Sequence, residues 1–69
     1  MAEEVDIRLD DKGDGVVAIQ KLLVRNGADL KFDGDFGPVT EQAVKDFQRN
    51  NKLTEDGIVG VRTLNALAN

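Results

Sequence analysis

The chain has 69 residues and contains no cysteine, histidine, serine, tryptophan or tyrosine, so most side chains that perform catalysis or bind transition metals are missing. A chain of this length forms one small domain, whose core cannot surround a deep active-site cleft. Thirteen acidic residues against nine basic ones give a formal net charge of -4, opposite to what binding nucleic acid or an anionic membrane requires. We therefore expect a folded monomeric domain that is not an enzyme, needs no cofactor, binds no nucleic acid and inserts into no membrane.

The N-terminal segment alternates apolar and charged residues. Val5, Ile7 and Leu9 flank Asp6 and Arg8, a pattern that suits a strand, but no second alternating run is present to pair with it. We therefore predict an extended arm that packs on helices. The predicted division of the chain is a flexible arm over residues 1–6 and a single domain over residues 7–68, with no secretory signal peptide at the start.

The first predicted helix runs from about Gly15 to Asn26. Asp14 is the expected N-cap and Gly27 the expected helix stop. The apolar residues recur at helical spacing. They are Val16, Ile19, Leu22 and Leu23.

Two further helices are predicted. The second runs from Pro38 to Asn50, because proline is favoured in a first turn, and the third follows Gly60 and ends with the chain. The two connections are longer than those between antiparallel neighbours in helical bundles, and each could run back along its helix. The predicted fold is all-α: a compact three-helix bundle with roughly parallel helices, two long loops and an extended N-terminal arm.

The two loops share a sequence repeat. Residues 33–40 and 56–63 both read D-G-x-x-G-x-x-T, and the match continues as Ala43-Val44 against Ala66-Leu67. Asp-Gly is a turn signal, the second glycine falls at a helix N-cap, and the threonine falls near the third helical position. Each copy therefore predicts a turn followed by a helix start. The predicted turn and cap residues are Gly13, Gly34, Gly37, Thr40, Gly57, Gly60 and Thr63.

Two interpretations of the repeat stay open. The loops are either hinges that close the bundle or sites where helix N-termini present donors to a ligand's carboxylates or carbonyls. Phe36 is either a core residue or a ligand contact, and Gln48, like Gln20, either holds a loop carbonyl or contacts ligand. The candidate ligand-binding residues are Asp33, Asp35, Phe36, Gln48, Asp56, Arg62 and Asn65.

Metal binding and catalysis are disfavoured by the residues at hand. Asp29, Asp33 and Gly34 match part of a calcium-binding loop, but Lys31 stands where an oxygen ligand is required and Thr40 where a glutamate belongs. The three threonines have no histidine base to activate them. We predict no metal site and no catalytic residue.

A set of residues spread over nearly the whole chain forms a recognisable pattern. They are Gly13, Val16, Ile19-Gln20, Leu23, Gly27, Asp33-Gly34, Phe36-Gly37, Thr40, Ala43-Val44, Phe47-Gln48, Leu53, Asp56-Gly57, Val59-Gly60, Thr63 and Leu67. With these residues the chain resembles, from about Ile7 to Ala68, the three-helix peptidoglycan-binding domain of bacterial cell-wall hydrolases and phage endolysins. Asp10 stands where that family often has glycine.

The resemblance implies a non-catalytic module that holds a linked or associated hydrolase against murein in the bacterial envelope or outside the cell, or in a phage-encoded enzyme. Because phenylalanine is the only aromatic residue type, we expect hydrogen bonding to the stem peptide or to the amides of the aminosugars rather than stacking on sugars. The alternative is an interaction or scaffold module that keeps the fold and docks protein.

Overall fold

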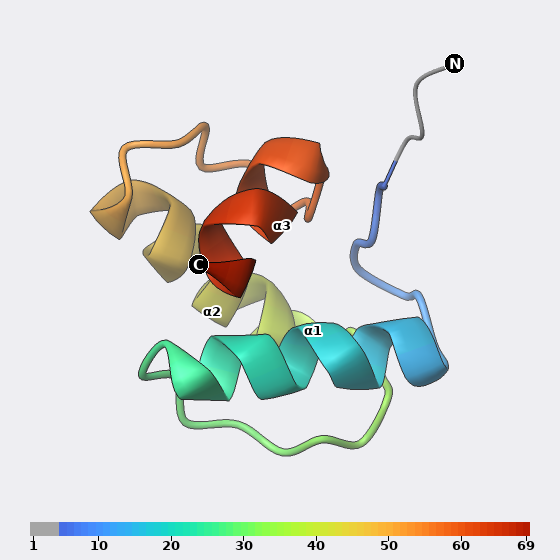
Figure 1. The fold of residues 1–69 in the computed structure, drawn as a ribbon. Coiled ribbons are helices and arrows are strands. Elements are labelled where there is room, and N and C mark those ends of the chain that lie inside the picture. The colour runs from blue at the N-terminus through green and yellow to red at the C-terminus, as the bar shows by residue number, and fades with distance from the viewer. Residues whose placement is uncertain (1–4) are drawn as a thin grey trace.

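The computed structural model describes residues 5–69 and contains three helices, α1 (Asp14–Arg25), α2 (Pro38–Asn50) and α3 (Val61–Ala68). Helix α1 packs against both of the others, and Figure 1 shows the loop after α1 running back along that helix before α2 begins. The prediction of an all-α three-helix domain is confirmed. None of the helices in residues 5–69 is long and apolar enough to cross a membrane.

The helices begin at glycine. Gly37 and Gly60 are the N-caps of α2 and α3 in extended backbone conformation, and Pro38 occupies the first helical position, as predicted. The predicted N-cap of α1 is wrong: Gly13 (φ +117°) is the cap, and Asp14 lies in the first turn. The Gly13 carbonyl accepts from the amides of Val16 and Val17, so the helical hydrogen bonds start one residue earlier than expected. Asp14 then contributes its charge to the positive end of the helix dipole.

Helix α1 ends in a Schellman motif. Arg25 is the last helical residue and Asn26 the C-cap, followed by Gly27 with φ +105°. The amide of Gly27 donates to the Val24 carbonyl and the amide of Ala28 to the Leu23 carbonyl, both at 3.0 Å. The prediction that Gly27 stops the helix is confirmed.

Helix α2 ends in the same way without a glycine. Asn51 is the C-cap, and Lys52 takes the left-handed conformation with φ +59°. The amides of Lys52 and Leu53 donate to the carbonyls of Arg49 and Gln48. A residue with a side chain therefore occupies a position that favours glycine.

The core lies between α1, the two loops and the inner faces of α2 and α3. Phe36 and Val59 occupy equivalent places in the two loops, and each is at most 1% exposed. Both loops are therefore anchored by an apolar residue. The fully buried apolar residues are Val16, Ile19, Leu23, Phe36, Val44, Val59 and Leu67.

The N-terminal arm bonds to the loops through its main chain. Ile7 exchanges two backbone hydrogen bonds with Val59 (3.1 and 2.8 Å), and further along the arm the amide of Asp10 donates to the Phe36 carbonyl at 2.8 Å. The half-buried Ile7 side chain packs on the core. An extended arm was predicted, but its partners are loop residues rather than helices alone. The first four residues of the predicted flexible arm 1–6 lie outside the described residues.

Candidate functional site

A buried glutamine organises the first loop. Gln20, on the inner face of α1, is 1% exposed. Its Oε1 accepts from the Gly34 amide at 3.0 Å, and its Nε2 lies 3.0–3.1 Å from Asp33 Oδ1, the Asp35 carbonyl and Thr40 Oγ1. One amide side chain thus joins α1, the turn and the start of α2.

The second loop is built from the same contacts. Gln48 Oε1 accepts from the Gly57 amide at 2.9 Å. Its Nε2 lies 3.0–3.1 Å from Asp56 Oδ1, the Ile58 carbonyl and Thr63 Oγ1. Each D-G-x-x-G-x-x-T copy is therefore paired with one glutamine from the preceding helix, and Gly34 and Gly57 both have φ +76°.

The aspartates of the two copies serve the turns that contain them. Asp33 Oδ1 accepts from the Asp35 amide and Asp56 Oδ1 from the Ile58 amide, both at 3.0 Å. The hydrogen bond from the Asp35 amide, followed by that from the Gln20 side chain, lowers the pKa of Asp33 below its usual value. Within residues 5–69, every buried side-chain nitrogen and oxygen has a hydrogen-bond partner. The hydrogen bonds of these buried groups hold the fold.

Two of the predicted ligand contacts are almost completely buried. Phe36 and Gln48 are each 1% exposed, because the ring fills the core and the amide is surrounded by loop groups. Phe36 lines none of the hollows described below, and Gln48 lies in the wall of one of them with almost no exposed surface. The structure instead supports the alternative roles of core residue and loop tether for these two residues.

The remaining predicted contacts are exposed but do not form one shared site. Asp33 and Asp35 line a hollow of about 500 Å³ beside the start of α2. Asp56 and Arg62 line another of about 370 Å³ beside the start of α3. Asn65 is exposed on α3 and belongs to neither hollow. The arm, bonded to Val59 at one end and to Phe36 at the other, links the two loops.

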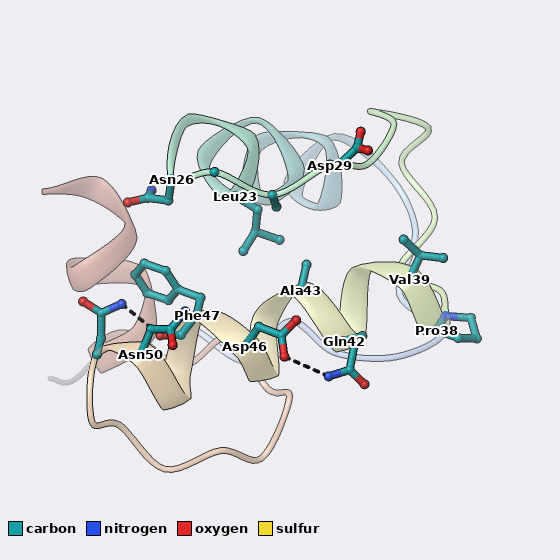
Figure 2. Close-up of a pocket in the computed structure, with 13 residues that line it drawn as sticks. Leu23, Asn26, Asp29, Pro38, Val39, Gln42, Ala43, Asp46, Phe47 and Asn50 are labelled. Atoms are coloured by element: carbon teal, nitrogen blue, oxygen red, sulfur yellow. Dashed lines mark hydrogen bonds between the residues drawn. The ribbon is translucent and has the colours of Figure 1, made fainter.

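The largest hollow, about 750 Å³, lies elsewhere, between the C-terminal end of α1 and the outer face of α2. In Figure 2, Leu23 from α1 and Ala43 and Phe47 from α2 point toward the space between the two helices. We call this hollow the α1–α2 groove. Its lining residues are Leu23, Asn26, Gly27, Ala28, Asp29, Pro38, Val39, Gln42, Ala43, Asp46, Phe47, Asn50 and Asn51.

Polar groups line the rim of the α1–α2 groove. Gln42 donates its Nε2 to Asp46 Oδ1 at 3.0 Å, and no lysine or arginine lines the groove. Three asparagines add further amides. The volume falls within the range of small-molecule and peptide sites, and an apolar floor with amide and carboxylate groups suits a ligand that is itself rich in amides and methyl groups.

Sequence reasoning missed this groove. The signal that could have revealed it is a second face of α2, where the apolar Ala43 and Phe47 are only half buried and lie beside Gln42, Asp46 and Asn50. In the part of the chain that the structure describes, no three acidic side chains gather closely enough to hold a metal ion. The chemistry available at the groove is hydrogen bonding and apolar contact.

The sequence matches one family, described as "Putative peptidoglycan binding domain", over residues 12–67. The chain belongs to that family. The matched segment includes all three helices apart from the final residue of α3, both loops and every residue of the α1–α2 groove. The family is a binding module whose catalytic partners are separate domains, so the chain is a non-catalytic peptidoglycan-binding module.

Similar proteins carry the domain as part of a longer chain. The domain is 39% identical over 62 residues to the zinc D-Ala-D-Ala carboxypeptidase of Streptomyces albus G, covering 81% of this chain and 24% of that protein. It superposes on a fused zinc-dependent amidase/peptidase/peptidoglycan-binding protein of Clostridium acetobutylicum with a TM-score of 0.94 and 36% identity, covering 97% of this chain and 30% of that one.

A phage protein also carries a similar domain as part of a longer chain. The endolysin of Burkholderia phage AP3 superposes with a TM-score of 0.88 and 39% identity, covering 90% of this chain and 24% of the endolysin. The domain therefore spans under a third of each of these three proteins.

Proposed function

We propose that the domain binds murein in the α1–α2 groove and thereby holds a linked or associated cell-wall hydrolase against its substrate, in the cell wall or outside the cell. The observation that carries this proposal is the groove itself, which is the largest of the three hollows described above and lies wholly inside the family match. The relatives that carry a similar domain are named as a carboxypeptidase, an amidase/peptidase fusion and an endolysin.

The chemistry of murein fits the lining of the groove. Its stem peptides present amide bonds, methyl groups and carboxylates, and its sugars carry acetamido groups. Asparagine and glutamine can both donate to and accept from such amides. The half-buried Ala43 and Phe47 supply apolar contact for methyl groups. The exposed predicted residues Asp35 and Arg62 supply secondary contacts at the loops in this proposal.

Binding by one isolated domain is expected to be weak. Phe47 is the only aromatic residue that lines the groove, so little of the energy comes from stacking. Linkage to a hydrolase and to a polymeric wall raises the effective concentration of the second contact and compensates for weak single-site affinity. The domain acts as a monomer in this arrangement, which light scattering of the purified chain tests.

Retention on purified insoluble murein tests the proposal. The native chain should sediment with murein, and the double variant Gln42→Ala/Asn50→Ala should lose retention by roughly tenfold because it removes two surface amides from the groove. Lys21→Ala is the matched control, since Lys21 is exposed on α1 and lines none of the three hollows. Circular dichroism must show that every variant is folded.

The outcomes separate the competing sites. Loss of retention in Asp35→Ala or Arg62→Ala, with the groove variant unaffected, would move the site to the loops. Absence of retention of the native chain would contradict murein binding altogether and would favour the interaction module that docks protein.

A further inference from the structure

The end of α1 carries an asparagine followed by glycine at an exposed position. Asn26 is the C-cap with φ -95° and ψ 13°, and Gly27 follows it with φ +105°. A glycine after asparagine leaves its backbone nitrogen unhindered by a side chain and free to adopt many conformations. Both residues are exposed, so water reaches them.

The Asn26 side chain joins two helix ends. Its Nδ2 donates to the Leu22 carbonyl in α1 at 2.8 Å and to the Leu67 carbonyl in α3 at 3.1 Å. Both acceptors lie in the last turn of their helices, where carbonyl groups carry partial negative charge. The two carbonyl groups need a hydrogen-bond donor at this place, and they would repel an acceptor there.

We propose that Asn26-Gly27 is a site of spontaneous deamidation, and that the reaction breaks the link between the ends of α1 and α3. The Gly27 backbone nitrogen gives up its proton to water and bonds to Asn26 Cγ. The Cγ–Nδ2 bond breaks, and Nδ2 takes up a proton and leaves as ammonia. Water then opens the resulting five-membered succinimide at either carbonyl, giving aspartate or isoaspartate.

The fold controls the first step. In the native helix end, the Gly27 amide donates to the Val24 carbonyl at 3.0 Å and the next amide to Leu23. The attack therefore requires the last turn of α1 to open, as helix ends do at low free energy. Deamidation proceeds in the native protein, but more slowly than in the unfolded chain.

The products are incompatible with the helix ends. A carboxylate at residue 26 has no proton to donate and faces the carbonyls of Leu22 and Leu67. Isoaspartate also lengthens the backbone, which removes the geometry of the Schellman motif. Because Asn26 and Gly27 line the α1–α2 groove, the reaction adds a negative charge at its edge.

The chain contains its own matched control. Asn51 is the C-cap of α2 with nearly the same backbone angles (φ -105°, ψ 11°), and its Nδ2 donates to the Phe47 carbonyl at 2.9 Å. The next residue is Lys52 rather than glycine. The two asparagines thus differ in the residue that follows them and in the second hydrogen bond of Asn26, which goes to the Leu67 carbonyl.

Peptide mapping by mass spectrometry, with chemical detection of isoaspartate, tests the reaction after incubation of the native chain at physiological temperature in mildly alkaline buffer. Asn26 should convert while Asn51 stays intact, and denaturant should accelerate conversion at Asn26. An intact Asn26, or equal conversion at both positions, would overturn the proposal. Equal rates of conversion in native and denatured protein would contradict the claim that the folded helix end slows the reaction.

Variants test the consequence. Asn26→Asp should lower the Tm by roughly 4–8 °C more than Asn51→Asp, because only the first also loses a bond to another helix. Amide hydrogen exchange in α3 should accelerate in Asn26→Asp alone. Equal effects of the two substitutions would refute the link between the ends of α1 and α3. If a variant does not fold, the peptide-mapping experiment still decides the proposal, because it uses the native chain.

Discussion

At the scale of single residues, two non-glycine residues among residues 5–69 hold conformations that favour glycine. Asp10 has φ +79° in the turn that closes with the hydrogen bond from the Asp11 amide to the Arg8 carbonyl, and Lys52 has φ +59° after α2. Asp10 stands where the family resemblance places a glycine, and the structure shows why glycine suits that position. The helix end at Gly27 meets the same requirement without strain.

Replacing Lys52 by glycine should therefore stabilise the domain. We expect Lys52→Gly to raise the free energy of unfolding by roughly 0.5–1 kcal/mol, because it removes the left-handed strain of a side-chain-bearing residue. Gly27→Ala is the opposite substitution at the equivalent position and should destabilise by about 1 kcal/mol. Urea unfolding of both variants measures this, and shifts of the same sign would contradict the explanation.

Asp33 makes stability depend on pH. Its pKa is lowered from the ordinary value of 3.8 in the folded state, so its contribution is fully present above that value and is lost as the pH falls through the folded pKa. Asp33→Asn keeps an accepting oxygen but no titrating group. We expect Tm measured against pH to fall less steeply below about pH 4 in this variant than in the native chain. Asp29→Asn changes the same charge in the same loop outside this network, and an equal effect of the control would contradict the assignment.

At the scale of elements, the two loops depend on one glutamine each. In a sheet or helix, a buried backbone amide donates to a main-chain carbonyl. In these two turns the buried amide donates instead to the side chain of Gln20 or Gln48. The loops consequently have fixed shapes although they contain little regular secondary structure. Each loop begins after the helix that carries its glutamine and ends at the helix that carries its threonine. The glutamine and threonine side chains of each loop are hydrogen-bonded to each other.

Removing either glutamine should be strongly destabilising. Gln48→Met keeps the side-chain size but leaves the buried Gly57 amide without an acceptor, so we expect a loss of about 2–3 kcal/mol, with a similar loss for Gln20→Met. A domain of this size has roughly 3–5 kcal/mol in total, so both variants should be near their unfolding midpoint. Chemical denaturation monitored by circular dichroism measures the loss, and values under about 1 kcal/mol would contradict the role.

The arm should contribute to stability from Ile7 onward, which is the start of the proposed domain. Deleting residues 1–6 should lower the Tm only slightly, since among the described residues it removes the half-buried Val5 and the exposed ion pair between Asp6 and Arg8. Deleting residues 1–9 should remove roughly 2 kcal/mol, because it also removes the half-buried Ile7 and its two main-chain bonds. Equal melting of the two truncated chains would place the domain boundary further along the sequence.

At the scale of the whole molecule, the sequence was sufficient to predict the helices but insufficient to predict the candidate site. Periodic apolar residues and the glycines before Pro38 and Val61 are local signals, so the helices were predicted within one residue. The α1–α2 groove is formed where the end of α1 and its following loop meet the outer face of α2, which depends on tertiary packing. The sequence left the role of Gln48 open between loop tether and ligand contact, because a local pattern does not reveal whether a polar side chain faces a buried loop.

The pairing of Ile7 with Val59 has a consequence for how the domain is made. Ile7 and Val59 lie far apart in the sequence of the domain, so during synthesis the arm has no partner until the second loop and its anchor have been translated. Long-range contacts of this kind carry a loop-closure entropy that only the assembled core offsets. The domain is therefore expected to acquire its native structure in one late event, after most of its chain has left the exit tunnel.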